Sequence, residues 1–268
     1  MILDGKVALI TGAGSGIGRA TALAMARRGA HLVLFGRTQA KLAETADLAA
    51  SHGARVETLG GDVAGETACA NALALARERF GRLDMLVNNA GNVRAGRLET
   101  TDIADIRAMI EVDLLAPILW SRAALPLLRA SRDGVIINVA SGIALVGAPF
   151  YATYAAAKAG LARFGEALHR ELLDEGVRVL TVYPGATETP MMASNKAGPD
   201  LGFARETPEM VADALVEGLV AGAREVIRAN ETRRAMIALN RDHPEQIDER
   251  FRVLKPRLEA AVAGHHAP

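Results

Sequence analysis

The sequence predicts an α/β fold in which helices cover both faces of a doubly wound parallel sheet of about seven strands. Three observations lead to this prediction. Short apolar runs alternate with stretches of helical periodicity, the runs are apolar at consecutive positions, and a glycine-rich turn follows the first run. Consecutive apolar positions are typical of strands that are buried on both faces, as in a parallel sheet.

The apolar runs recur along most of the chain. We expect strands at 6–11, 31–35, 55–59, 84–87, 135–139 and 177–182, with a seventh at 224–228. We expect helices at 16–28, 38–51, 66–80, 101–128, 154–174 and 207–221, the fourth of them in spite of Pro117. Because parallel strands are joined by right-handed crossovers, ligands should bind at the carboxyl ends of the strands.

The length of 268 residues suits one domain that spans residues 1–268. Within it, the segment 186–206 combines glycine and proline with apolar side chains such as Met191 and Phe203, which is typical of a loop or short helix over a ligand pocket. Residues 231–268 form a charged tail of helical pattern, and we expect Pro244 and Pro256 to interrupt it.

The composition argues against several classes of protein. The 31 basic and 31 acidic residues cancel, so no net charge favours nucleic acid or an anionic membrane surface. Cys69 is the only cysteine and the histidines are scattered, so we expect no disulfide and no metal site. The N-terminus lacks a signal-peptide pattern and no apolar run is long enough to span a membrane, so we expect a cytoplasmic protein.

A glycine-rich sequence directly follows the first expected strand and opens the first expected helix. Glycine permits positive φ and lets backbone N–H groups approach a phosphate, and the helix N-terminus adds partial positive charge. No Lys-Ser or Lys-Thr pair follows the last glycine, which argues against a nucleoside-triphosphate site. The pattern therefore predicts a dinucleotide site, with contacts from Gly12, Gly14, Ser15, Gly16, Ile17 and Gly18.

The end of the second expected strand indicates which dinucleotide binds. A carboxylate there would bind a free ribose 2′-hydroxyl, whereas an arginine accommodates a 2′-phosphate. This chain has Arg37 followed by Thr38 and no acidic residue at that position. We therefore expect NADP(H) in preference to NAD(H), although Arg37 is alternatively an ordinary surface arginine.

Tyr154 and Lys158 are four residues apart, on one face of an expected helix. An unperturbed tyrosine has a pKa of about 10, and a neighbouring ammonium lowers that pKa and makes proton transfer near neutral pH accessible. Ser141 follows the fifth expected strand, where its hydroxyl could hold a substrate oxygen; a turn or cap role is the alternative.

Taken together, these residues resemble the short-chain dehydrogenase/reductase family, whose members have a Rossmann fold. The resemblance covers about residues 6–192. Its motifs are Thr11-Gly12-x-x-x-Gly16-x-Gly18, Asn88-Asn89-Ala90-Gly91, Ser141 with Tyr154-x-x-x-Lys158, and Pro184-Gly185 with Thr189. All of them stand in the order and at the spacing of the family.

The resemblance implies a role for each matching residue. Tyr154 would exchange a proton with the substrate oxygen, Lys158 would lower the tyrosine pKa and bind the nicotinamide ribose, and Ser141 would stabilise the substrate oxygen. Asp62 and Val63 would hold the adenine ring. The other expected cofactor contacts are Thr38, Asn89, Ala90, Gly91, Tyr154, Pro184, Gly185, Thr187 and Thr189. A homodimer or homotetramer is also implied.

One position departs from the family pattern. Asp113 stands in Val112-Asp113-Leu114, where the family usually has an asparagine that helps to hold a water in a proton relay. An ionised aspartate accepts hydrogen bonds but donates none, and its charge would weaken the effect of Lys158 on the tyrosine pKa. We expect catalysis with a shifted pH profile; the alternative is that Asp113 replaces the asparagine without consequence.

The resemblance implies an NADP-dependent oxidoreductase that acts on a small-molecule carbonyl or alcohol. A non-catalytic NADP(H)-binding sensor is the alternative from another class, although the chain retains the tyrosine, lysine and serine. A sugar-nucleotide epimerase or dehydratase on a related fold is a third possibility, but such enzymes usually have a second substrate lobe and a different glycine spacing.

Overall fold

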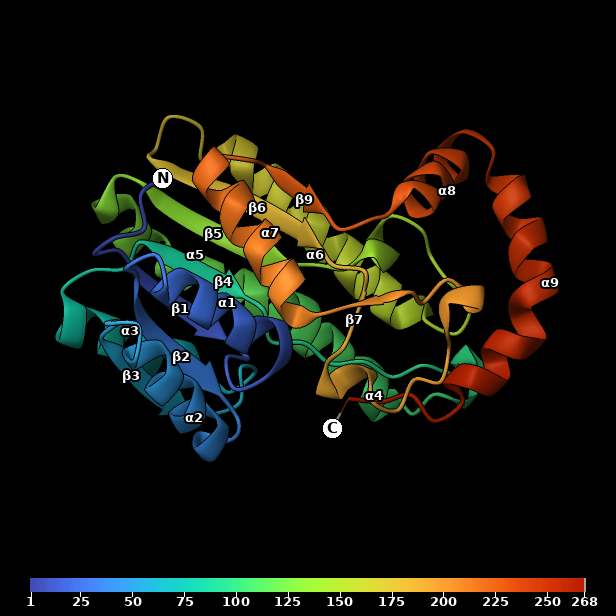
Figure 1. Ribbon diagram of the computed structural model, residues 1–268, viewed down its shortest axis with the longest axis horizontal. Coiled ribbons are helices and arrows are strands. Elements are labelled where there is room, and N and C mark those ends of the chain that lie inside the picture. Colours follow the sequence, from blue (N-terminus) through green and yellow to red (C-terminus); the bar gives the residue numbers. More distant parts are fainter. Residues whose placement is uncertain (268) are drawn as a thin grey trace.

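The computed structural model describes residues 1–267 and contains a seven-stranded sheet in which all neighbouring strands are parallel (Figure 1). The strand order is β3-β2-β1-β4-β5-β6-β9, so the chain winds outward from β1 and then, in the other direction, from β4. This arrangement confirms the predicted doubly wound Rossmann fold. The strands are β1 Val7–Thr11, β2 His31–Gly36, β3 Val56–Gly60, β4 Met85–Asn88, β5 Gly134–Val139, β6 Val177–Tyr183 and β9 Glu225–Ile227.

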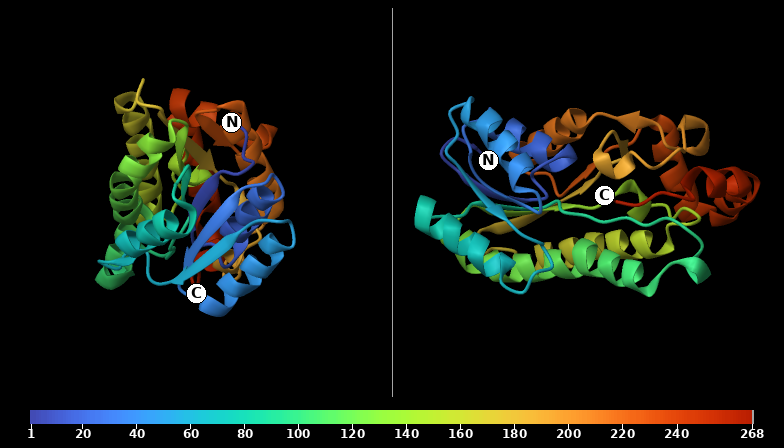
Figure 2. Two further views of the ribbon diagram at one scale, coloured as in Figure 1. Left: turned by 90° about the vertical axis from the view of Figure 1, so that its left-hand side faces the viewer. Right: turned by 90° about the horizontal axis from the view of Figure 1, so that it is seen from below.

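Helices form a layer on each face of the sheet, as the right-hand view of Figure 2 shows. One layer contains α1 Gly16–Ala26, α2 Gln39–Ala50 and α7 Pro208–Ala221, and the other contains α3 Ala68–Phe80, α5 Ala116–Ser131 and α6 Ala152–Glu171. Successive side chains of a strand point to opposite faces, so Ile10 packs under α1 whereas Leu9 packs with Trp120 of α5. The sheet is therefore held by two apolar cores.

Burial on both faces holds for the central strands but not for the edges. Every residue of β1, β4 and β5 is buried. In contrast, β3 and β9 consist of half-buried and exposed residues. The expectation of full burial is wrong for these two strands, because each has a neighbouring strand on one side only.

The long helix expected at 101–128 is a continuous path of three parts. It comprises α4 Ile103–Ile110, a π-helical turn at Glu111–Leu115, and α5. Pro117 lies in the first turn of α5, directly after the π-helical turn, and the helical path continues through it. The π-helical turn holds Asp113, which is fully buried, so the unusual residue of the sequence coincides with the irregular turn of the helix.

The segment 186–206 begins and ends in a small parallel sheet. In it β7, Ala186–Thr187, pairs with β8, Arg205–Glu206, and two short 3₁₀ turns, Pro190–Met192 and Pro199–Leu201, lie between them. The segment therefore contains irregular loop and short 3₁₀ turns, and the pairing of β7 with β8 joins its two ends.

The tail forms an arm beyond the carboxyl ends of the strands, at the right of Figure 1. It consists of α8 Glu231–Asp242 and α9 Pro244–Val262. Pro244 separates the two helices as expected, but the expected interruption at Pro256 is wrong, because α9 continues through it. Pro256 is exposed, so water can bind the carbonyl that loses its helical partner.

No helix within residues 1–267 is both long enough and apolar enough to cross a membrane.

Candidate active site

A cavity of about 1320 Å³ opens at the carboxyl ends of the strands. The loops after β1, β2, β4, β5 and β6 line it, and the segment 186–206 and residues of α8 and α9 complete its wall. Almost every residue that the sequence suggested meets there: Gly12, Gly14, Ser15, Gly16, Ile17, Arg37, Thr38, Asp62, Val63, Asn89, Ala90, Gly91, Ser141, Tyr154, Lys158, Pro184, Gly185, Thr187 and Thr189. Gly18 and Asp113 lie behind this surface.

Gly12 and Gly18 allow the loops after β1 and β4 to pack together. Gly12 has φ of 66°, and a Cβ on it would lie 2.9 Å from the Ala90 Cα. A Cβ on Gly18 would lie 2.3 Å from the Gly12 carbonyl oxygen. The Asn89 Nδ2 donates hydrogen bonds to the Thr11 and Gly12 carbonyls at 2.9 and 3.2 Å. Gly18 therefore acts through the shape of the turn and not by lining the cavity.

The turn after β1 has the features that a dinucleotide phosphate requires. The N-terminus of α1 lies beside it, with Ser15 at the N-cap, and the first turn of α1 carries no acidic residue. The partial positive charge of the helix is therefore not compensated by its own side chains. The residues present fit a bound NAD(P), whose phosphates would lie at this turn.

At the end of the cavity near β2 and β3, hydrogen bonds to the backbone hold Asp62 and Val63 in place. The Asp62 Oδ1 accepts a hydrogen bond from the Ala64 N–H at 3.0 Å, and the Val63 carbonyl accepts one from the Trp120 Nε1 at 2.9 Å. Arg37 and Thr38 line the cavity from the end of β2. Adenine and the adenosine ribose would lie at this end.

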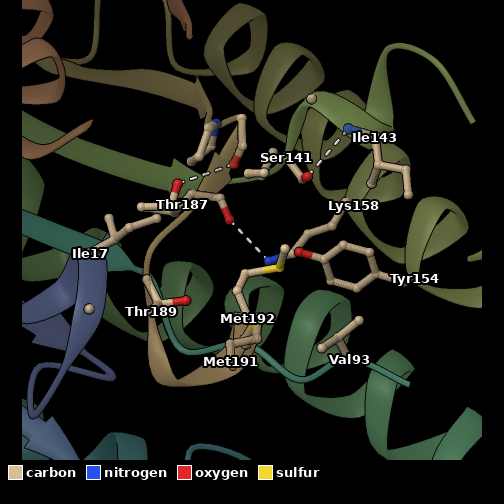
Figure 3. A pocket seen from close by; sticks show the side chains of 18 of the residues that line it. Ile17, Val93, Ser141, Ile143, Tyr154, Lys158, Thr187, Thr189, Met191 and Met192 are labelled. Atoms are coloured by element: carbon tan, nitrogen blue, oxygen red, sulfur yellow. Dashed lines mark hydrogen bonds between the residues drawn. The ribbon is translucent and has the colours of Figure 1, made fainter. Parts of the chain in front are cut away.

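The other end of the cavity brings together three side chains from neighbouring elements (Figure 3). Tyr154 and Lys158 lie one turn apart on α6, and the Lys158 Nζ is 5.8 Å from the centroid of the Tyr154 ring. Ser141 follows β5, where its Oγ accepts a hydrogen bond from the Ile143 N–H at 3.3 Å. Ser141 therefore caps the short turn that follows it and also lines the cavity.

Lys158 is held from behind by a buried ion pair. Its Nζ lies 3.0 Å from the Asp113 Oδ1 and donates a hydrogen bond to the Val139 carbonyl at 3.0 Å. Asp113 is also bound by the Asn92 N–H, at 3.2 Å from each carboxylate oxygen. The π-helical turn of the helix therefore places a carboxylate directly against the lysine.

These neighbours act on the pKa of Tyr154 in opposite directions. Burial raises the pKa of the phenol, the Lys158 ammonium lowers it, the Asp113 carboxylate raises it and the Ser141 hydroxyl lowers it, which leaves it above its usual value. For Lys158, burial lowers the pKa, but the effects of Asp113 and Tyr154 raise it by more than burial lowers it. The pKa of Lys158 therefore lies above its usual value, and the side chain stays a charged ammonium. Tyr154 is therefore a neutral phenol beside the charged ammonium of Lys158.

The sequence did not indicate which residues of the tail reach the cavity. Met236 of α8, Phe251 and Leu254 of α9, and His265 all line it. Burial lowers the pKa of His265 to about 4, so its ring is neutral near neutral pH. The local pattern of the tail shows only charged, amphipathic helices, and no signal within it identifies these side chains, because their contacts join distant parts of the chain.

The segment 186–206 is fastened to other parts of the cavity wall. The Asn195 Nδ2 donates a hydrogen bond to the Tyr151 hydroxyl at 2.9 Å, and the Lys196 N–H donates one to the Ala261 carbonyl at 3.0 Å. Asp200 forms an ion pair with Arg257 of α9. The loop and the tail therefore form one connected wall over the Tyr154 end of the cavity.

Comparison with known proteins identifies the family of this chain. The family model for short chain dehydrogenases matches residues 6–200. An uncharacterized oxidoreductase of Thermotoga maritima is 39% identical over 75% of this chain and 79% of its own length. A 3-oxoacyl-[acyl-carrier-protein] reductase of Synechocystis is 36% identical over 75% of this chain and 82% of its own length.

A ketoacyl reductase, HetN, of Nostoc is 30% identical over 93% of this chain and 89% of its own length. The family match and the doubly wound parallel sheet indicate the same class of enzyme. The chain belongs to the short-chain dehydrogenase/reductase family and is an oxidoreductase.

Proposed function

We propose that the protein uses NADP(H) to transfer a hydride between nicotinamide and a carbonyl or alcohol, with Tyr154 as the general acid/base. The observation that carries this proposal is the meeting of Tyr154, Lys158 and Ser141 in the cavity that also contains the glycine-rich turn. The retention of all three side chains favours a catalyst over a non-catalytic NADP(H) sensor. The reductase names of the Synechocystis and Nostoc relatives support a carbonyl substrate.

The nicotinamide supplies the hydride when the cofactor is bound. In the reducing direction the Tyr154 hydroxyl donates its proton to the substrate oxygen, and the Ser141 hydroxyl hydrogen-bonds the same oxygen. The Lys158 ammonium stabilises the phenolate that remains and would bind the nicotinamide ribose. Because Tyr154 is a neutral phenol, it is ready to donate to a carbonyl, which suits reduction.

Other residues of the cavity position the two ligands. Pro184, Gly185, Thr187 and Thr189 would contact the nicotinamide, and the segment 186–206 would cover the substrate. Met191 and Met192 line this end of the cavity (Figure 3) and give this cover an apolar surface. We infer that self-association uses the continuous helical path from α4 to α5. Ile103 of α4, Leu115 of the π-helical turn and Leu119 of α5 are exposed apolar side chains along it.

Replacing Arg37 by glutamine is expected to raise the KM for NADPH by roughly 10-fold or more, because a charge-assisted contact with the 2′-phosphate is lost. The KM for NADH should hardly change, since NADH lacks that phosphate. Arg28→Gln, which removes an exposed arginine outside the cavity, is the matched control. An equal change with both cofactors, measured by steady-state kinetics, would contradict NADP selection by Arg37.

Asp113→Asn is expected to shift the pH profile of alcohol oxidation to lower pH. Oxidation requires the Tyr154 phenolate, and the Asp113 carboxylate raises the pKa of Tyr154. A neutral asparagine removes that effect, so the rising limb of the profile should begin at lower pH. Asp105→Asn, at a half-buried carboxylate of α4 that lies outside the cavity and pairs with Arg94, is the control. An unmoved profile in Asp113→Asn would show that the carboxylate has no influence on the phenol.

A further inference from the structure

The substrate end of the cavity contains arginines that the proposed reaction does not use. Arg233 is in the first turn of α8 and lines the cavity. Its Nη2 donates a hydrogen bond to the Gly142 carbonyl at 3.1 Å. Because Gly142 directly follows Ser141, this guanidinium lies close to the place where the substrate oxygen would bind.

A second arginine lines the same cavity. This residue is Arg250 of α9, and its charge acts on Arg233: burial lowers the pKa of Arg233 and Arg250 lowers it further. Arg234 also lines this end, but its Nε is bound to the Ala229 carbonyl at 3.1 Å. Cations that are placed near one another favour an anion between them.

The acidic residues of the cavity do not balance these charges. Among the described residues that line it, the carboxylates are Asp62 and Glu206. Asp62 belongs to the adenine end, and the Glu206 Oε2 accepts from Arg228 at 2.9 and 2.7 Å. Within residues 1–267, neither Arg233 nor Arg250 forms an ion pair with a carboxylate. The positive charge at this end is therefore not neutralised by a carboxylate of the described residues.

We propose that Arg233, assisted by Arg250, binds a carboxylate of the substrate, so that the enzyme acts on oxo acids or the matching hydroxy acids. A guanidinium has five N–H donors, and Arg233 uses one on Gly142, which leaves an edge for a carboxylate. Phe251 and Leu254 supply apolar surface for the rest of the chain. The inference rests on the proposed function, because it places the carbonyl at Ser141 and Tyr154.

Matched acids and esters test this subsite. We expect the protein to reduce acetoacetate and levulinate with higher kcat/KM than their methyl esters. Arg233→Gln should lower kcat/KM for the acids roughly 10- to 100-fold, mainly through KM, while the values for the esters hardly change. Arg233→Lys keeps the charge but not the planar fork and should restore part of the loss. Arg241→Gln, on the exposed side of α8, is the control for a lost charge on this helix.

Three outcomes would overturn the inference. One is an equal loss for acids and esters in Arg233→Gln, which would show a structural role. Another is a preference of the parent protein for the esters. The third is reduction of acetoacetyl-coenzyme A in preference to acetoacetate with no effect of Arg233→Gln, which would place the substrate on a thioester carrier.

A binding measurement separates this inference from the proposed function. If no carbonyl compound is reduced, the proposed reaction fails, but calorimetry on the NADP⁺-loaded protein still tests the subsite. We expect hexanoate to bind more tightly than hexanamide, and this difference should disappear in Arg233→Gln. Equal binding of hexanoate and hexanamide to the parent protein would overturn the carboxylate subsite.

Discussion

Tyr154→Phe is expected to lower kcat by roughly 10²- to 10⁴-fold, because the phenol is the proton donor of the reaction. Phenylalanine keeps the ring, so its packing beside Lys158 and Tyr151 is preserved. NADPH should bind with unchanged affinity, since the adenine and phosphate contacts lie elsewhere in the cavity. Stopped-flow absorbance of NADPH under single-turnover conditions measures the first effect, and titration of NADPH fluorescence measures the second.

The chain offers a matched control for this change. Tyr183 lies on β6 outside the cavity, where its hydroxyl donates a hydrogen bond to the Glu225 Oε1 at 2.8 Å. Tyr183→Phe also removes a hydroxyl but should leave turnover nearly intact. Equal turnover in Tyr154→Phe and the parent protein would remove Tyr154 from the reaction.

Lys158→Met is expected to remove activity and to destabilise the fold. The change leaves the Asp113 carboxylate buried without its cation, and breaking a buried ion pair costs about 3–5 kcal/mol in the free energy of unfolding. Urea denaturation of the cofactor-free protein measures this loss. The loss should shrink as the pH falls, because burial raises the pKa of Asp113 and a protonated carboxyl no longer carries the buried charge.

A double-mutant cycle identifies the source of that loss. In Asp113→Asn with Lys158→Met, neither charge remains, so the free energy of unfolding should recover most of what Lys158→Met removes. Activity should stay low, since the ammonium is still absent. Additive losses of stability in the double variant would contradict a coupled buried pair and would indicate that the lysine acts through packing alone.

The fold was predictable because its signals are local. The apolar runs of β1 and β5 occupy positions where both faces are covered, and the turn from Gly12 to Gly18 marks the first crossover. The edge strands were less predictable, since the sequence does not state which strand lacks a neighbour. Pro256 shows why the rule that proline interrupts a helix can fail. Its effect depends on whether water can bind the backbone carbonyl that loses a helical hydrogen bond, and the sequence does not show which side of the helix is exposed.

Some residues of the candidate site could likewise be predicted from the sequence, and others could not. Ser141, Tyr154 and Lys158 were found by spacing, and the structure places them in one cavity. For Asp113 the sequence indicated an altered charge, but not the π-helical turn and the 3.0 Å contact through which that charge reaches Lys158. Arg233 could not be found at all, because its position beside Gly142 depends on how the whole tail folds back over the cavity.

The central claim is that a hydride moves from the nicotinamide to a carbonyl carbon. The most direct test is to reduce levulinate or its methyl ester with NADPH in which both hydrogens at the reactive carbon of the nicotinamide are deuterium, and to examine the product by mass spectrometry. We expect an alcohol that carries deuterium at the former carbonyl carbon, formed by the parent protein and almost absent with Tyr154→Phe. An unlabelled alcohol, or NADPH consumed with no alcohol formed, would contradict it.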